Sequence, residues 1–107
     1  MALVEEKCTP PVAGTPPLGW EAAAQLHGEV PEWTLEPDRL LREFKLTGFP
    51  EAMAFVGRVA EIAQAEDHHP EICINYNRVA LILTTHKLGG LSRNDFIVAA
   101  KLDQLSR

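Results

Sequence analysis

The longest periodic stretch of the chain runs from Pro50 to Glu66, where apolar residues recur at spacings of three and four. This spacing places them along one side of an α-helix, and Pro50 suits the first helical position. Pro70 disfavours helical geometry at His69, so the helix is expected to end near Glu66, before the run Asp67-His68-His69-Pro70. The apolar side consists of Ala52, Phe55, Val56, Val59, Ile62 and Ala63.

Two segments that follow this helix alternate in the manner of β-strands. Residues 72–76 and 79–84 predict a hairpin, with Asn77-Arg78 as the two-residue turn. Tyr76 then pairs with Val79, and the same register sets His69 opposite His86. Directly opposed residues share a face at roughly 4.5–5.5 Å between Cβ atoms. The hairpin is therefore expected to bring these two imidazoles together.

The remaining patterns complete the order of elements. They predict a helix at 20–27, strands at 33–36 and 40–46, and a helix at 92–105. Ser92 is the expected N-cap of the last helix, with Asp95 as its capping-box partner three residues later. The order α-β-β-α-β-β-α predicts an α+β fold, a four-stranded antiparallel sheet with three helices packed on one face.

The first 17 residues form a separate, Pro-rich segment that cannot propagate a helix or a central strand. We expect residues 1–17 to be an N-terminal arm, extended or mobile, and residues 18–107 to be a single domain. The segment contains Pro10, Pro11, Gly14, Pro16 and Pro17.

Composition excludes several classes of protein. A net charge of −5 with scattered basic residues argues against direct nucleic-acid binding, which needs Lys and Arg to neutralise phosphates. The apolar run 79–83 is far too short to span a membrane, and no secretory leader opens the chain, so a cytoplasmic protein is expected. Two distant cysteines suit a reducing compartment, and Cys73, within a predicted strand, is expected to be a small buried residue.

Candidate chemistry is concentrated in histidines. Three of the four, His68, His69 and His86, lie near the predicted hairpin, with Asp95 close behind. Histidine has an unperturbed pKa that lets it exchange a proton near neutrality, so the cluster predicts an acid–base site. A metal site is the alternative, because these residue types also ligate zinc. Adjacent histidines point apart and the helical i, i+4 pair is missing, so we expect no metal.

These residues also carry a resemblance. In order and spacing, the chain resembles the pterin-4a-carbinolamine dehydratase family, also known as the dimerisation cofactor of a hepatocyte nuclear factor. The matching residues are Trp33, Phe49-Pro50-Glu51-Ala52, His68-His69-Pro70, Tyr76-Asn77-Arg78-Val79, Thr85-His86, Gly90-Leu91-Ser92 and Asp95.

The resemblance implies a homo-oligomer, a dimer or tetramer, that uses no metal or organic cofactor and dehydrates a 4a-hydroxytetrahydropterin to a quinonoid dihydropterin. It implies that His68, His69 and His86 form the catalytic site, with His68 and His86 as the main acid–base pair and His69 binding or orienting the pterin or assisting catalysis. The expected register sets His69 opposite His86, so which of the two adjacent histidines acts with His86 stays open. Asp95 would orient a histidine, and Trp33 would line the pocket, although each also has a structural explanation, as a capping residue and as a core residue.

The sequence departs from the family pattern at Gln64, where a charged residue is usual, at Ile72, where an aromatic is common, and in its arm. The family also includes non-catalytic members that bind protein partners, such as a Rubisco assembly factor of carboxysome-bearing bacteria or a transcriptional coactivator. Such a factor, with carboxysome association in the Rubisco case, is the alternative function.

Overall fold

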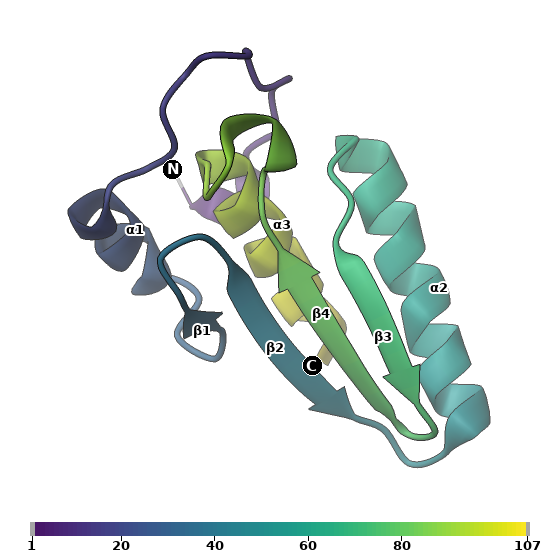
Figure 1. Cartoon of the computed structure of the whole chain (residues 1–107). Coiled ribbons are helices and arrows are strands. Elements are labelled where there is room, and N and C mark those ends of the chain that lie inside the picture. The colour runs from purple at the N-terminus through teal and green to yellow at the C-terminus, as the bar shows by residue number, and fades with distance from the viewer. Residues whose placement is uncertain (1, 107) are drawn as a thin grey trace.

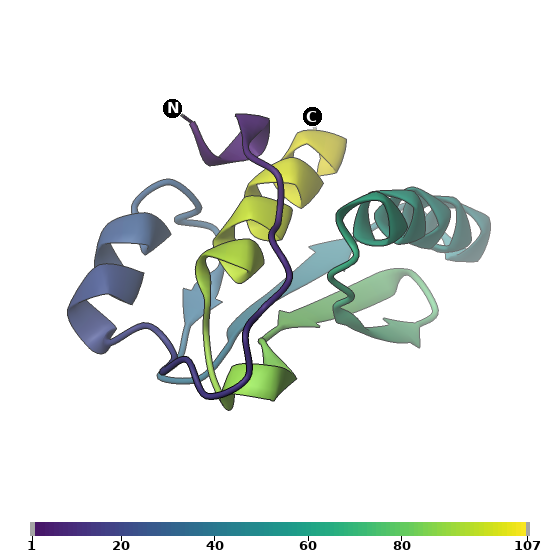
Figure 2. The ribbon, with the colours of Figure 1, turned by 90° about the horizontal axis from the view of Figure 1, so that it is seen from above.

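The computed structural model describes residues 2–106 and has the predicted α+β architecture. Four antiparallel strands form one sheet in the order β1-β2-β4-β3, and three α-helices cover one of its faces (Figures 1 and 2). The elements are η1 (Leu3–Glu5), α1 (Trp20–His27), β1 (Thr34–Leu35), β2 (Leu40–Lys45), α2 (Phe49–Glu66), β3 (Glu71–Asn75), β4 (Arg78–Leu83), η2 (His86–Leu88), α3 (Arg93–Asp103) and η3 (Gln104–Ser106). None of the helices among the described residues is long and apolar enough to cross a membrane.

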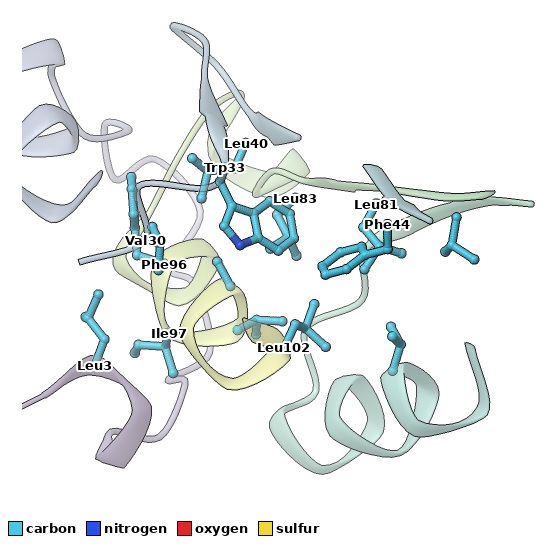
Figure 3. Packing of buried hydrophobic residues seen from close by; sticks show 14 of the residues in the cluster. Leu3, Val30, Trp33, Leu40, Phe44, Leu81, Leu83, Phe96, Ile97 and Leu102 are labelled. Atoms are coloured by element: carbon cyan, nitrogen blue, oxygen red, sulfur yellow. The ribbon is translucent and has the colours of Figure 1, made fainter. Parts of the chain in front are cut away.

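The core lies between the sheet and the helices. Alternate residues of β2 and β4 point toward the helices, and side chains of α3 pack against them from the other side (Figure 3). Each large apolar side chain buried in this way stabilises the fold by roughly 1.5–3 kcal/mol. The sheet contributes Leu40, Phe44, Val79, Leu81 and Leu83, and α3 contributes Phe96, Ile97, Val98 and Leu102.

Helix α2 ends where the sequence predicts, but a different residue ends it. Asp67 adopts the left-handed conformation at φ 51°, and its N–H bonds back to Ala63 and Gln64 carbonyls. The N–H of His68 then reaches the carbonyl of Ala63 at 3.1 Å. This backbone turn, and not the effect of Pro70, reverses the chain, and it carries His68 back beneath the helix end.

The predicted hairpin is present, but the predicted turn is wrong. Asn75 pairs with Arg78, so Tyr76-Asn77 is the turn, and Tyr76 has φ 53°. The reason is a contact with the end of β2: Leu46 N–H donates to Asn77 O at 2.7 Å, and Asn77 Nδ2 donates to Leu46 O at 3.1 Å. The pairing of β3 with β4 is therefore shifted by two positions from the predicted register. This shift leaves each side chain on its predicted face of the sheet, but it does not set His69 opposite His86.

Strand β3 is an edge strand, and this overturns the expected burial of Cys73. Only β4 pairs with β3 among the described strands. Cys73 pairs with Ala80 on the face that no helix covers, and its side chain is exposed. Ile72 and Ile74 face the helix side but remain 38% and 36% exposed at the rim.

Between η1 and α1 the N-terminal segment has no helix or strand, and it is docked on the rest of the chain. Leu3, in η1, is 1% exposed and belongs to the core. From there the segment passes between α3 and the C-terminal end of α2 toward η2 (Figure 2). Its polar contacts are with residues beside the candidate site, described below.

Candidate active site

The candidate site is built around a hydrogen bond between His68 and Asp95. The Nε2 atom of His68, just beyond the end of α2, lies 2.6 Å from Oδ1 of Asp95, in the first turn of α3. His68 is 8% exposed and Asp95 is fully buried. A 2.6 Å contact with a buried carboxylate is a short, charge-assisted hydrogen bond, so it holds the imidazole ring in one orientation.

The second oxygen of Asp95 is also occupied. Oδ2 accepts the hydroxyl of Thr85 at 2.8 Å and the backbone N–H of Ser92 at 2.9 Å. The Ser92 bond is the Asp95 half of the predicted capping box. Because the single Thr85 hydroxyl hydrogen goes to the carboxylate, the 2.7 Å contact between Thr85 and Ser92 hydroxyls has Ser92 as its donor. The carboxylate therefore has its position determined by three separate segments of the chain.

This arrangement defines which nitrogen of His68 is left for chemistry. A carboxylate accepts hydrogen bonds, so Nε2 of His68 carries the hydrogen and Nδ1 is free of that contact. Among residues 2–105, no fully buried side-chain nitrogen or oxygen lacks a hydrogen-bond partner. Nδ1 of His68 makes no hydrogen bond within that part of the chain, and the His68 side chain is 9% exposed. The ring thus combines a carboxylate-held side with a side that can exchange a proton.

The other two histidines are exposed. His69 contacts Gln64 through Nε2 and Oε1 at 3.1 Å, on the outer side of the α2 terminus. His86 begins η2, directly after the buried Thr85. It lines a pocket of about 330 Å³ with Asp38, Arg39, Glu71, Ile82, Thr84 and Gly89. His68 does not line this pocket, and His86 is linked to the His68–Asp95 pair only through its chain neighbour Thr85.

Trp33 is in the hydrophobic core and not in this site. Its side chain is 1% exposed, and its indole N–H donates to Asp103 Oδ1 at 2.7 Å. Asp103 is the last residue of α3 and Asp95 lies in its first turn, so the two are about 12 Å apart along the helix. The core explanation of Trp33 is therefore the one that its contacts support.

Sequence reasoning missed two parts of the site. Thr85 belongs to a sequence motif, but the motif does not indicate that its hydroxyl anchors Asp95. Gln64 departs from the family pattern, and the structure makes it the partner of His69. The only signal for this contact in the sequence is the position of Gln64 shortly before the adjacent histidine pair at the helix end.

A metal centre has no support from the geometry of residues 2–106. No three His, Cys, Asp or Glu side chains in that part of the chain converge in a way that suits a metal ion. Nε2 of His68 is already hydrogen-bonded to Asp95, and both carboxylate oxygens of Asp95 accept hydrogen bonds. That the chemistry needs no metal stays a prediction.

Comparisons with known proteins agree with the resemblance. Residues 16–105 match the family model of pterin 4 alpha carbinolamine dehydratase. A provisionally assigned pterin-4-alpha-carbinolamine dehydratase of Halorhodospira halophila is 44% identical over 107 residues, 98% of each chain. One from Chloroflexus aurantiacus is 51% identical over 85 residues, which are 79% of this chain and 90% of that protein.

Two solved structures have the same fold. A transcriptional coactivator/pterin dehydratase from Brucella melitensis superposes with a TM-score of 0.79 at 28% identity, over 85% of this chain and 99% of that one. A pterin dehydratase-like protein identified as a RuBisCO assembly factor in the alpha-carboxysome gives 0.57 at 21% identity, over 69% of this chain and 86% of that one. The second likeness speaks for the fold alone.

Proposed function

Since this chain belongs to the pterin 4 alpha carbinolamine dehydratase family, we propose that it dehydrates a 4a-hydroxytetrahydropterin by histidine acid–base catalysis. In that reaction an acid protonates the hydroxyl on C4a, which leaves as water, and a base removes the proton from N5. The N5 electron pair forms the new double bond to C4a. The product is a quinonoid dihydropterin, and no electrons are gained or lost overall.

The observation that carries this proposal is the 2.6 Å contact between His68 and Asp95. A carboxylate that holds Nε2–H leaves Nδ1 as the proton acceptor and stabilises the imidazolium that forms when a proton arrives. Such an oriented group contributes roughly 10²–10⁴-fold to a rate. We assign His68 as one member of the acid–base pair and Asp95 as its positioning residue.

His86 is the proposed second member of the pair. It is exposed, it lies next to Thr85 of the Asp95 network, and it lines the pocket at the end of β4. The pocket falls within the volume range of small-molecule sites. His69, exposed and paired with the neutral amide of Gln64, is proposed to bind or orient the pterin.

We also propose that the protein forms a homodimer in which the β3 strands of two copies pair with each other. This strand has an exposed edge, and it contains no Lys or Pro and a single charged residue, Glu71, to discourage pairing with another strand. An antiparallel copy centred on Cys73 would set Ile72 opposite Ile74 and Glu71 opposite Asn75. That register pairs all five residues of β3 and covers the two half-exposed isoleucines.

The activity is tested by generating a 4a-hydroxytetrahydropterin in place and following its loss. The protein is expected to accelerate dehydration well above the spontaneous rate, with the quinonoid dihydropterin as product. Denatured protein at the same concentration is the control for background. A folded protein that never exceeds the background rate would remove the enzymatic function.

The alternative that we propose is a protein-binding role, like that of the transcriptional coactivator/pterin dehydratase of Brucella melitensis or of the RuBisCO assembly factor. It is favoured by the apolar residues left on the surface, including Trp20 at 58% and Tyr76 at 66% exposed. An inactive protein that captures Rubisco or a transcription factor from purified components would support it. An active protein that binds neither would leave the dehydratase as the function.

A further inference from the structure

The N-terminal segment contacts the residue that introduces the His68 turn. Cys8 N–H donates to Glu66 Oε1 at 2.9 Å, and Lys101 Nζ donates to Oε2 at 2.7 Å. Burial would raise the pKa of Glu66, but the Lys101 and Cys8 hydrogen bonds and the charges of Lys101 and Lys7 together lower it to about 2. Glu66 is therefore a charged, 8% exposed anchor two positions before His68.

The same segment contacts the residue just before Asp95. Asn94 is 6% exposed, and its side-chain amide makes two hydrogen bonds to the backbone of Thr9. Oδ1 accepts Thr9 N–H at 3.1 Å, and Nδ2 donates to Thr9 O at 2.7 Å. This two-point contact determines both the position and the direction of the segment at the start of α3.

A third anchor lies on the loop between η2 and α3. Leu18 N–H donates to Leu91 O at 2.8 Å. Pro17 packs so closely on Gly90 that a Cβ at Gly90 would lie 2.9 Å from the Pro17 Cβ. Residues 7–18, which we call the strap, therefore touch each of the three segments that carry the candidate site.

We propose that the strap positions the His68–Asp95 pair, with Glu66 and Asn94 as the positioning residues. His68 and Asp95 belong to different elements, and their contact survives only while the end of α2 and the start of α3 keep their spacing. A displacement of about 1 Å would stretch the 2.6 Å contact beyond hydrogen-bond range. Cys8 and Thr9 are consecutive residues, so they link Glu66 to Asn94 through one stretch of backbone.

The strap has little overlap with the family-matched region, which begins at residue 16, but the Halorhodospira halophila relative aligns over 98% of this chain. The catalytic part of this inference rests on the proposed function, because it gives His68 a role in proton transfer. The geometric part does not, since it concerns the resting protein.

A matched pair of variants at Thr9 tests the strap. Thr9→Pro removes the N–H that Asn94 accepts, and Thr9 already precedes Pro10, which favours the extended backbone that proline can adopt. Thr9→Ala keeps that N–H and is the control. We measure the ¹⁵N and ¹H signals of the His68 ring by NMR, together with kcat and KM.

Thr9→Pro and Asn94→Ala are expected to shift or broaden the His68 Nε2–H signal. They should also lower kcat, by about ten-fold for Asn94→Ala, with KM almost unchanged, because the strap orients a proton-transfer group and does not bind substrate. Thr9→Ala should leave signal and rate as they are. Leu3→Ala, which weakens the core without touching Glu66 or Asn94, should lower the Tm and leave the signal in place.

An unchanged His68 signal in folded Thr9→Pro and Asn94→Ala would overturn the inference, and so would an equal shift in Leu3→Ala. The NMR measurement uses the protein without substrate. It therefore tests whether the strap positions the His68–Asp95 pair, whether or not the wild type dehydrates pterins. Failure of the proposed function appears separately, as a wild-type rate equal to background.

Discussion

His68 and Asp95 lie 27 positions apart in the sequence, and their side chains meet at 2.6 Å through Nε2 and Oδ1. One carboxylate oxygen holds the ring, and the other caps α3 and accepts the hydroxyl of Thr85. A group that orients a histidine and also caps a helix ties the local chemistry to the stability of the fold. Variants at His68, His86 and Asp95 separate these two roles.

Removing a proposed proton-transfer group should lower the rate without unfolding the protein. His68→Ala and His86→Ala are each expected to reduce the dehydration rate by about 10²-fold or more, because each deletes one acid or base. Rates are measured with the in-place assay, and circular dichroism checks folding. His27, which contacts the carbonyl of Trp33 at 2.6 Å outside the site, provides the control variant His27→Ala. Near-normal rates in both site variants would exclude histidine catalysis.

Asp95→Asn should impair both stability and activity. The amide has the shape of the carboxylate but replaces one acceptor oxygen by a donor, so it leaves a hydrogen bond with His68 or Thr85 unmade in a buried place. A loss of about 2–3 kcal/mol in the free energy of unfolding is expected, measured by urea denaturation. Asp67→Asn makes the same chemical change at an exposed position where Asn tolerates the left-handed backbone, and it should cost little. Equal stability of the two variants would contradict the buried network.

Glu66 should make stability depend on pH in the acid range. Its folded-state pKa is lowered from 4.5 to about 2, so its stabilising contribution is present above about pH 4.5 and is lost as pH falls toward 2. Glu66→Gln is expected to remove on the order of 1–3 kcal/mol near neutral pH and to flatten this acid limb. Glu43→Gln, at an exposed pair 3.6 Å from Arg78, is the comparison. Parallel pH–stability curves for wild type and Glu66→Gln would argue against the anchor.

The proposed dimer predicts a disulfide between two copies. If β3 pairs with itself around Cys73, the opposed Cα atoms lie about 4.5–5.5 Å apart, within the range that a disulfide spans. Mild oxidation should therefore yield a covalent dimer on a non-reducing gel. Cys73→Ser should abolish that dimer and Cys8→Ser should not, because burial raises the pKa of Cys8 to about 12 and keeps it a thiol.

Light scattering tests the same β3 interface without the need for a disulfide. The wild type is expected to be a dimer at micromolar concentration, and Ile74→Lys should favour the monomer by placing a charge on the edge strand. A wild type that is monomeric throughout that range would rule out β3 pairing.

Local patterns were sufficient to predict most of the fold. The spacing of apolar residues predicts α2, and the order of elements predicts the sheet with its helices on one face. The expected end at Glu66 is correct, although the left-handed Asp67 causes it and not Pro70. The turn register was not readable from the hairpin alone. It depends on Asn77 bonding to Leu46, a residue of a different segment. Exposure of Cys73 depends on β3 being at the edge, which is a property of the whole sheet.

The candidate site can be predicted only in part from the sequence, for the same reason. Histidine spacing indicated His68, His69 and His86, and the capping pattern indicated Asp95. The pairing of His68 with Asp95, the role of Thr85 and the contacts of Glu66 and Asn94 with the strap all join residues far apart in sequence. The periodicity of apolar residues does not predict such contacts, because each contact depends on how the complete helices and strands pack against one another.

The shared carboxylate of Asp95 has a consequence for the motions of the protein. Fraying of the first turn of α3 that moves Asp95 also releases the His68 ring, because Ser92 N–H and His68 Nε2 bind the two oxygens of one side chain. The His68–Asp95 contact therefore opens at least as often as that helix end carries Asp95 away. The exchange rate of the Ser92 amide hydrogen with solvent thus reports the opening of the helix end that the His68 ring shares.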